Sequence, residues 1–178
     1  MGIRDVEIAR IKKYAEGLGI KVLMKPYTPG SGDGEWDCIE RKIIIYVADG
    51  QAKSDIILAL LHELGHHLDW IYKNKEVPED VIKAYERLCE GDASGERLDL
   101  SKKDRKIILD EELSGIRYMD IIHKELDLKL PLWRVKVCQE LDIFAYQTLY
   151  DTSKFPTLKQ YNNLKKRLTK KFKALYSK

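Results

Sequence analysis

The stretch Ala52–Tyr72, AKSDIILALLHELGHHLDWIY, decides the fold. Its apolar side chains recur at steps of three and four residues, and no proline interrupts them. Those side chains are Ile57, Leu60, Leu61, Leu64, Leu68 and Ile71. The spacing predicts an amphipathic helix across the whole stretch, with Ser54 or Asp55 as its N-terminal cap.

Two histidines of this stretch, His62 and His66, are four residues apart. On a helix their imidazoles project from one face and can reach a single cation, and zinc suits two neutral ring nitrogens. Glu63 is offset by one position, which places its carboxylate beside the ion, where it can take a proton from a bound water. Gly65 leaves room for a neighbouring strand or helix to come close. The alternative is a pair of surface histidines on an amphipathic helix.

A catalytic zinc ion usually has three protein ligands and a water. After His67 the only later histidine is His123, so no third histidine follows at short range. Glu111 and Glu112 are the best candidates, because a glutamate on a following helix can face the first two ligands. The residues therefore predict a His, His, Glu site with an open fourth position and leave both glutamates as candidates.

The segment Leu60–Asp69, LLHELGHHLD, resembles the gluzincin group of zinc metallopeptidases. It is especially similar to the small ImmA/IrrE-type, phage-encoded and minigluzincin-like peptidases, and the resemblance covers roughly Ile20–Ile122. The resemblance implies a zincin-like fold and a hydrolase, a metalloendopeptidase that uses one zinc ion to cleave peptide bonds. It implies His62 and His66 as metal ligands and Glu63 as the catalytic residue that activates the water.

In the gluzincin group the glutamate ligand often precedes a small residue by three positions. That pattern favours Glu112, which Gly115 follows, over Glu111 as the third ligand. The chain departs from the group at two positions, because members commonly have alanine in place of Gly115, and Ile116 stands where thermolysin-like members have an aspartate. Many members also use a tyrosine or histidine to stabilise the oxyanion, and spacing does not choose among three tyrosines of this chain: Tyr118, Tyr146 and Tyr150.

Other polar residues near the motif are weaker candidates. His67 lies roughly 140° round the helix from His62, so we expect it to be a packed or surface residue. Asp69 either orients the ring of His66 or is a solvated carboxylate. His123 lies about 16 Å along the helix axis from Glu112, and we expect it to have a surface role.

Elsewhere the patterns predict short strands and further helices. Ile20–Met24 and Ile43–Val47 are β-favouring runs, and Trp36–Ile39 is a hairpin partner. We expect Ile43–Val47 to be an edge strand that binds an extended peptide by backbone pairing, with a buried core strand as the alternative. Helices are expected at Ile3–Leu18, from Pro78 to about Cys89, from Ser101 to about Leu126, from Pro131 to Tyr150, and after Pro156. With the resemblance, this predicts an α+β, zincin-like fold with a small, mostly antiparallel sheet, the active-site helix and about five helices in all.

Length and charge predict how the chain is organised. At 178 residues it fits one domain, which we place at residues 1–156, with a basic C-terminal helix at residues 157–178. This last segment holds 8 basic and no acidic residues in a chain of net charge +3. We expect a helix docked on the domain with a solvated basic face. The alternatives are binding of nucleic acid or an acidic partner, and obstruction of the active-site cleft.

Composition favours a cytoplasmic protein with no membrane association. The longest apolar runs, Ile43–Ala48 and Ile56–Leu61, are too short to cross a bilayer, and the charges in Met1–Glu7 argue against a secretory signal. We therefore predict a zinc metallopeptidase of the cytoplasm that acts on a peptide or protein. The alternatives are a regulatory or nucleic-acid-binding module with a latent or structural metal site, and a zymogen blocked by its C-terminal segment.

Overall fold

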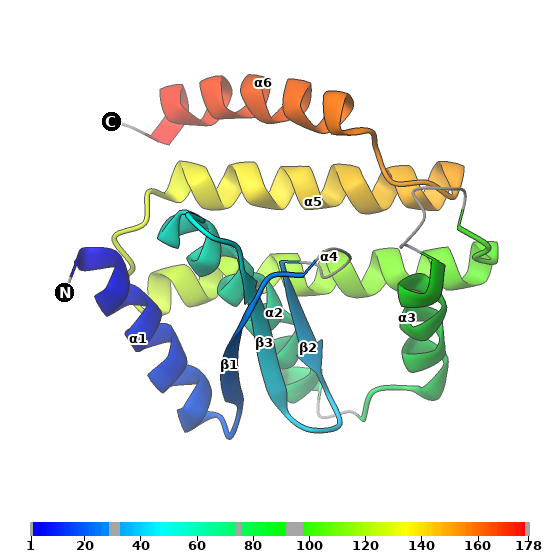
Figure 1. Ribbon diagram of the computed structural model, residues 1–178, viewed down its shortest axis with the longest axis horizontal. Coiled ribbons are helices and arrows are strands. Elements are labelled where there is room, and N and C mark those ends of the chain that lie inside the picture. Colours follow the sequence, from blue (N-terminus) through cyan, green and yellow to red (C-terminus); the bar gives the residue numbers. More distant parts are fainter. Residues whose placement is uncertain (1, 29–32, 74–75, 92–97, 177–178) are drawn as a thin grey trace. The chain divides into compact units, whose positions relative to one another are not determined.

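The chain folds as two compact units. Figure 1 labels the helices and strands that make them up. The computed structural model describes residues 2–28, 33–73, 76–91 and 98–176. The sheet unit comprises Met1–Asn74 and Gly115–Leu130, and the helical unit comprises Lys75–Ser114 and Pro131–Lys178. The helix α4 (Lys102–Glu125) is continuous across this division, so its first half counts with the helical unit and its second half with the sheet unit.

The sheet unit is built on a three-stranded mixed sheet. Besides the second half of α4, it contains α1 (Ile3–Gly17), β1 (Lys21–Pro26), β2 (Gly34–Asp37), β3 (Lys42–Val47) and α2 (Lys53–Lys73). The strand order is β1-β3-β2, with β1 parallel and β2 antiparallel to β3. The expectation of a mostly antiparallel sheet was wrong, because the chain reverses direction twice between β1 and β3. The described residues form six helices, where about five were expected.

The strand β3 lies in the middle of the sheet. Ile43, Ile44 and Ile45 are all buried, which is typical of a strand that has a neighbour on each side and is covered on both faces. The expectation that Ile43–Val47 is an edge strand was therefore wrong, and the alternative, a buried core strand, is confirmed. Among the described strands, the edges of the sheet are β1 and β2.

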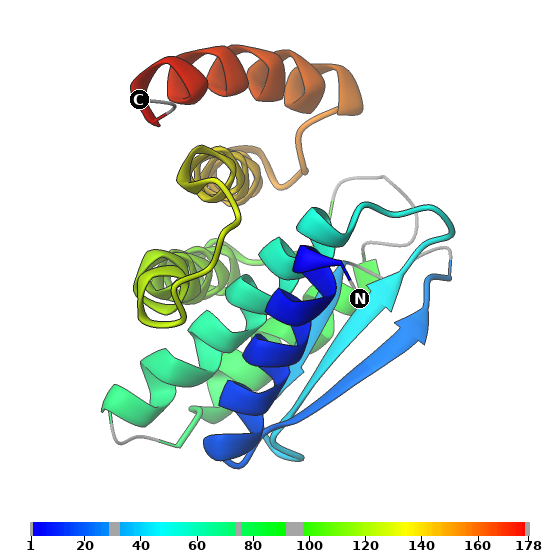
Figure 2. The ribbon, with the colours of Figure 1, turned by 90° about the vertical axis from the view of Figure 1, so that its left-hand side faces the viewer.

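The helices α1 and α2 pack against the same face of the sheet, as Figure 2 shows. The periodic positions of α2 form its buried stripe, except that Ile71 at the end of the helix is exposed. The fully buried residues of these two helices include Ile11, Ala15, Ile57, Leu60, Leu61 and Leu64. The hydrophobic spacing that predicted the helix Ala52–Tyr72 thus reflects its packing in the core.

The helix α2 and the second half of α4 touch at two glycines. A Cβ added at Gly65 would lie 2.2 Å from the carbonyl oxygen of Gly115, which is far inside the contact distance of the two atoms. A Cβ added at Gly115 would lie 2.8 Å from Cε1 of the His66 ring. The space that Gly65 was expected to leave for a neighbouring helix is occupied by α4.

We predict that Gly65→Ala lowers the free energy of unfolding by about 1–3 kcal/mol, because the added methyl group must push the two helices apart. Gly17→Ala is the matched control, since Gly17 also lies in a helix but has open space at its Cβ position. That control should leave stability unchanged or raise it by up to about 1 kcal/mol. Urea unfolding measures both variants, and a Gly65→Ala chain as stable as the control would contradict the close contact.

The helical unit contains four segments whose starting points the sequence predicted. They are α3 (Glu79–Gly91), the first half of α4, α5 (Leu132–Thr152) and α6 (Leu158–Tyr176). Each of α3 and α5 begins directly after a proline, as expected from Pro78 and Pro131. The predicted starts of these helices are therefore confirmed.

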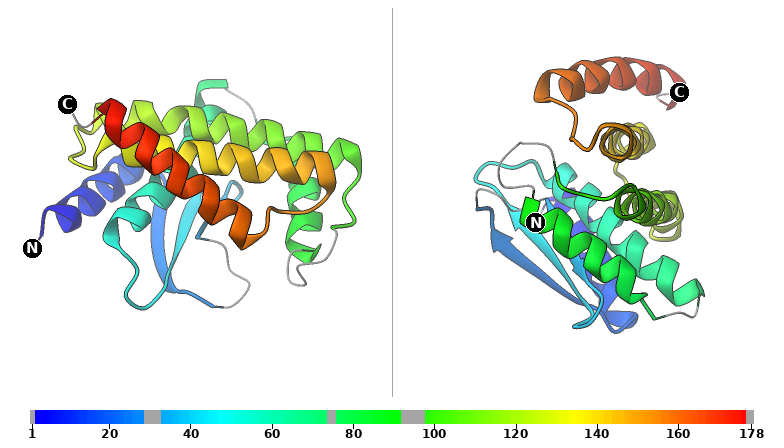
Figure 3. Two further views of the ribbon diagram at one scale, coloured as in Figure 1. Left: turned by 90° about the horizontal axis from the view of Figure 1, so that it is seen from above. Right: turned by 90° about the vertical axis from the view of Figure 1, so that its right-hand side faces the viewer.

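The helices α5 and α6 form an antiparallel hairpin. Ser153 ends α5 in the left-handed region, with φ 59°, and the chain then turns so that α6 runs back across α5 (Figures 1 and 3). The contact is apolar and consists of Val137 and Leu141 from α5 with Leu168 and Phe172 from α6. The apolar side of α6 is therefore used for packing on α5, except for Leu175 near its end, which is exposed.

Ser101 caps α4, as its position in the sequence predicted. The backbone N–H of Asp104 donates to Ser101 Oγ at 3.0 Å, and the Ser101 hydroxyl donates to the Asp104 carboxylate at 2.7 Å. The guanidinium of Arg87 on α3 pairs with the same carboxylate at 2.6 Å. This group of three side chains fixes the start of α4 to α3 within the helical unit.

The cap makes stability depend on pH. Burial raises the pKa of Asp104, but the hydrogen bonds from Ser101 and Arg87 outweigh it and hold this pKa below its ordinary value. A lowered carboxyl pKa contributes stability that is present above about pH 4 and is lost as the pH falls through the folded-state pKa. Urea unfolding of the wild type should therefore show a steeper acid loss than unfolding of Asp104→Asn. Identical slopes below about pH 4 would refute the assignment.

Candidate metal centre

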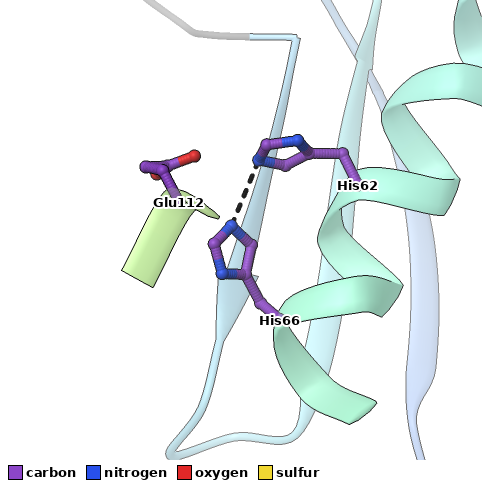
Figure 4. A group of neighbouring side chains, drawn as sticks. All are labelled: His62, His66 and Glu112. Atoms are coloured by element: carbon purple, nitrogen blue, oxygen red, sulfur yellow. Dashed lines mark hydrogen bonds between the residues drawn. The ribbon is translucent and has the colours of Figure 1, made fainter. Parts of the chain in front are cut away.

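The helix α2 brings His62 and His66 together. Their Nε2 atoms are 3.1 Å apart, so one imidazole donates to the other, and the ring centroids are 4.9 Å apart with planes at 69°. His66 is buried and His62 is half-buried. Figure 4 shows the two nitrogens facing one another. A cation between the rings would replace the proton that they share here.

The helix α4 adds Glu112 to this pair. Glu112 lies one helical turn before Gly115, the residue whose backbone contacts Gly65. One ligand atom from each of His62, His66 and Glu112 lies within 4.8 Å of the others, and Figure 4 shows the carboxylate beside the two rings. Donors around a tetrahedral ion with bonds of about 2.1 Å lie roughly 3.5 Å apart. The group therefore has the donors and the spacing to hold a metal ion.

The alternative third residue, Glu111, is not part of this group among the described residues. Neighbouring positions on a helix point about 100° apart. Only one of two adjacent glutamates can therefore face the histidines, and among the described residues it is Glu112.

Tyr85 on α3 holds the carboxylate of Glu112. Its hydroxyl donates to Glu112 Oε1 at 2.7 Å. Burial raises the pKa of Tyr85 well above its ordinary value, and the adjacent carboxylate raises it further. Tyr85 therefore remains a protonated donor at physiological pH. Sequence reasoning missed this residue, because its place on the apolar side of α3 reads as core.

His66 is held by two neighbours within the sheet unit. The indole of Trp36 on β2 lies parallel to the imidazole, with an interplanar angle of 3° and a centroid distance of 6.3 Å, an offset stack. Gly115 approaches the same ring so closely that an alanine there would meet it at 2.8 Å. The position of the His66 ring thus explains why residue 115 is glycine and not alanine.

Glu63 lies outside the group of metal ligands and against β2. A Cβ added at Gly34, the first residue of β2, would lie 3.0 Å from Cγ and Oε1 of Glu63. The Glu63 side chain is half-buried. The residue that the sequence singled out as a base therefore borders the start of an edge strand.

His67 is a packed residue, one of the two roles expected for it. It lies edge-on to Trp36 at a centroid distance of 6.0 Å, and its Nε2 has no hydrogen-bond partner among the described residues. Burial, together with the positive charge of Arg41, lowers the pKa of His67 to about 4. His67 is therefore neutral at physiological pH.

The remaining candidates have other surroundings. Asp69 is buried, so the interpretation as a solvated carboxylate was wrong. The Nε2 of His123 lies 2.7 Å from the carbonyl oxygen of Leu130, which gives His123 a structural contact in place of the expected surface role. Tyr146 packs against Phe155 and Tyr150 against Lys102 in the helical unit.

The chain matches no protein-family model, and comparison with curated proteins and with solved structures found no significant match. Among the described residues, no helix combines the length and the apolar character needed to cross a bilayer.

We predict that Tyr85→Phe weakens binding of divalent metal ions by about 10–100-fold, because the ligand Glu112 loses the donor that orients it. Competition with a chromogenic chelator measures the affinity. Tyr14→Phe is the matched control. Tyr14 lies on α1, and its hydroxyl also donates to a carboxylate, that of Glu125, which is not one of the three candidate ligands. Equal affinities for the two variants would show that Tyr85 has no part in metal binding.

Proposed function

We propose that this protein is a zinc metallopeptidase of the gluzincin type. In this proposal His62, His66 and Glu112 hold one zinc ion, and Glu63 is the general base. The observation that carries it is the convergence of two imidazole nitrogens and one carboxylate oxygen within 4.8 Å. Zinc accepts this donor set and leaves a fourth position open in catalytic sites, whereas magnesium and calcium prefer oxygen ligands.

Each residue of the centre has a separate task. Bound zinc would supply Lewis acidity that polarises a peptide carbonyl and lowers the pKa of water. Glu63 would accept a proton from the attacking water and deliver it to the leaving nitrogen, for which a carboxylate beside the ligands is suited. Tyr85 would keep the Glu112 carboxylate in one orientation, and Trp36 would do the same for the ring of His66.

The strand β2 offers a place for the substrate. It is an edge of the described sheet, and its first residue, Gly34, lies against Glu63. An extended peptide that paired with β2 would carry its backbone past the Glu63 carboxylate. This favours β2 over β3 as the strand that binds substrate, because β3 has neighbours on both sides.

The expected result for Glu63→Gln is loss of hydrolysis by about two to four orders of magnitude with zinc content unchanged, because the amide is not a base. Elemental analysis measures bound zinc, and cleavage of an unfolded protein substrate measures activity. His62→Ala is the companion variant and should lose both properties, because it removes a ligand.

Two outcomes would refute this proposal. Equal loss of zinc in Glu63→Gln and His62→Ala would mean that Glu63 is a ligand and no separate base exists. Failure of the wild type to bind zinc would remove the basis for metal-dependent hydrolysis.

A further inference from the structure

The exposed side of α6 carries a dense row of positive charge. Seven described residues of this helix are basic, and all seven are exposed: Lys159, Lys165, Lys166, Arg167, Lys170, Lys171 and Lys173. The helix has no acidic residue. Of the basic residues, Lys171 and Lys173 lie over the aromatic rings of Phe172 and Trp133. Among the described residues, no ion pair joins any of the seven to a carboxylate.

The row has a regular geometry. Lys159, Lys166 and Lys170 lie within about 40° of one another around the helix, at a spacing of 100° per residue. They extend over roughly 17 Å along its axis, given a rise of 1.5 Å per residue. Asn162 and Asn163, both exposed, stand between them and add neutral hydrogen-bonding groups. The result is a straight surface of cations and amides, opposite the side that packs on α5.

We propose that this face of α6 binds the phosphate backbone of duplex DNA without sequence preference. About 17 Å of duplex carries roughly 10 phosphate charges, so a straight row of lysines meets a matching line of anions. Lysine and asparagine side chains are typical phosphate contacts. The proposal goes beyond hydrolysis and does not depend on the metal centre.

Two other classes of partner fit the surface less well. A helix that lies in a membrane interface inserts its apolar side, but Leu168 and Phe172 of α6 are buried against α5. A protein partner usually covers a core of apolar and aromatic residues, and the row of lysines and asparagines contains none. Duplex DNA needs neither feature.

The test is fluorescence anisotropy of a labelled duplex of about 20 base pairs with full-length protein in the presence of a metal chelator. At about 50 mM salt we expect a Kd on the order of micromolar, with roughly 40-fold weaker binding at about 200 mM, as for three phosphate contacts. No binding at the lower salt concentration would overturn the proposal.

The variant Lys159→Gln, Lys166→Gln, Lys170→Gln tests the location of the binding site. It should weaken binding at least about tenfold and reduce the salt slope by about 3. The control with the same change in net charge is Lys13→Gln, Lys21→Gln, Lys25→Gln, at exposed positions of the sheet unit. It should bind DNA like the wild type, and equal losses in the two triple variants would overturn the proposal. Circular dichroism checks that both variants are folded.

Two further measurements distinguish the partners. Vesicles containing about one-third phosphatidylserine, or an acidic polypeptide such as polyglutamate, should bind more weakly than DNA at equal salt. Tighter binding of either one would overturn the choice of DNA. Glu63→Gln should bind DNA like the wild type, so that failure of DNA binding and failure of the proposed hydrolysis are separate results.

Discussion

The candidate centre depends on the contact between α2 and α4 at Gly65 and Gly115. At this point the two backbones approach until there is no space for even one methyl group at Gly65. A side chain at either glycine would separate the helices or displace the ring of His66. Each glycine costs about 1 kcal/mol of helix propensity, and the close packing that it permits offsets this cost. The ligands lie near this contact, His66 next to Gly65 and Glu112 one turn from Gly115.

The protonation of the surrounding groups suits a site for a cation. Tyr85 keeps its proton because burial and the Glu112 carboxylate both raise its pKa, so it remains a donor to that carboxylate. His67 remains neutral because burial lowers its pKa. It therefore adds no positive charge beside His66. A hydrogen bond that fixes a carboxylate in one orientation is a typical supporting contact in metal sites.

The two proposals rest on different parts of the chain. Hydrolysis rests on α2, on the turn of α4 that carries Glu112, and on the edge strand β2, where Gly34 meets Glu63. DNA binding rests on α6, whose apolar side is occupied by α5 and whose charged side has no carboxylate partner among the described residues. A basic surface of this kind would keep the protein close to DNA, whether or not the metal centre catalyses hydrolysis.

By itself the sequence determined the features that depend on local spacing. The apolar period of Ala52–Tyr72, the prolines before α3 and α5, and the Ser101 cap each act over one or two helical turns, and the structure has helices where they predicted them. The separation of His62 and His66 likewise placed both rings on one face. Tertiary structure decided the rest, because it depends on residues far apart in the chain. The pairing of β3 with two neighbours made it central, although an apolar run suits an edge or a core. The packing of α4 brought Glu112 and not Glu111 to the two histidines, and only the packing of α3 brought Tyr85 to that carboxylate.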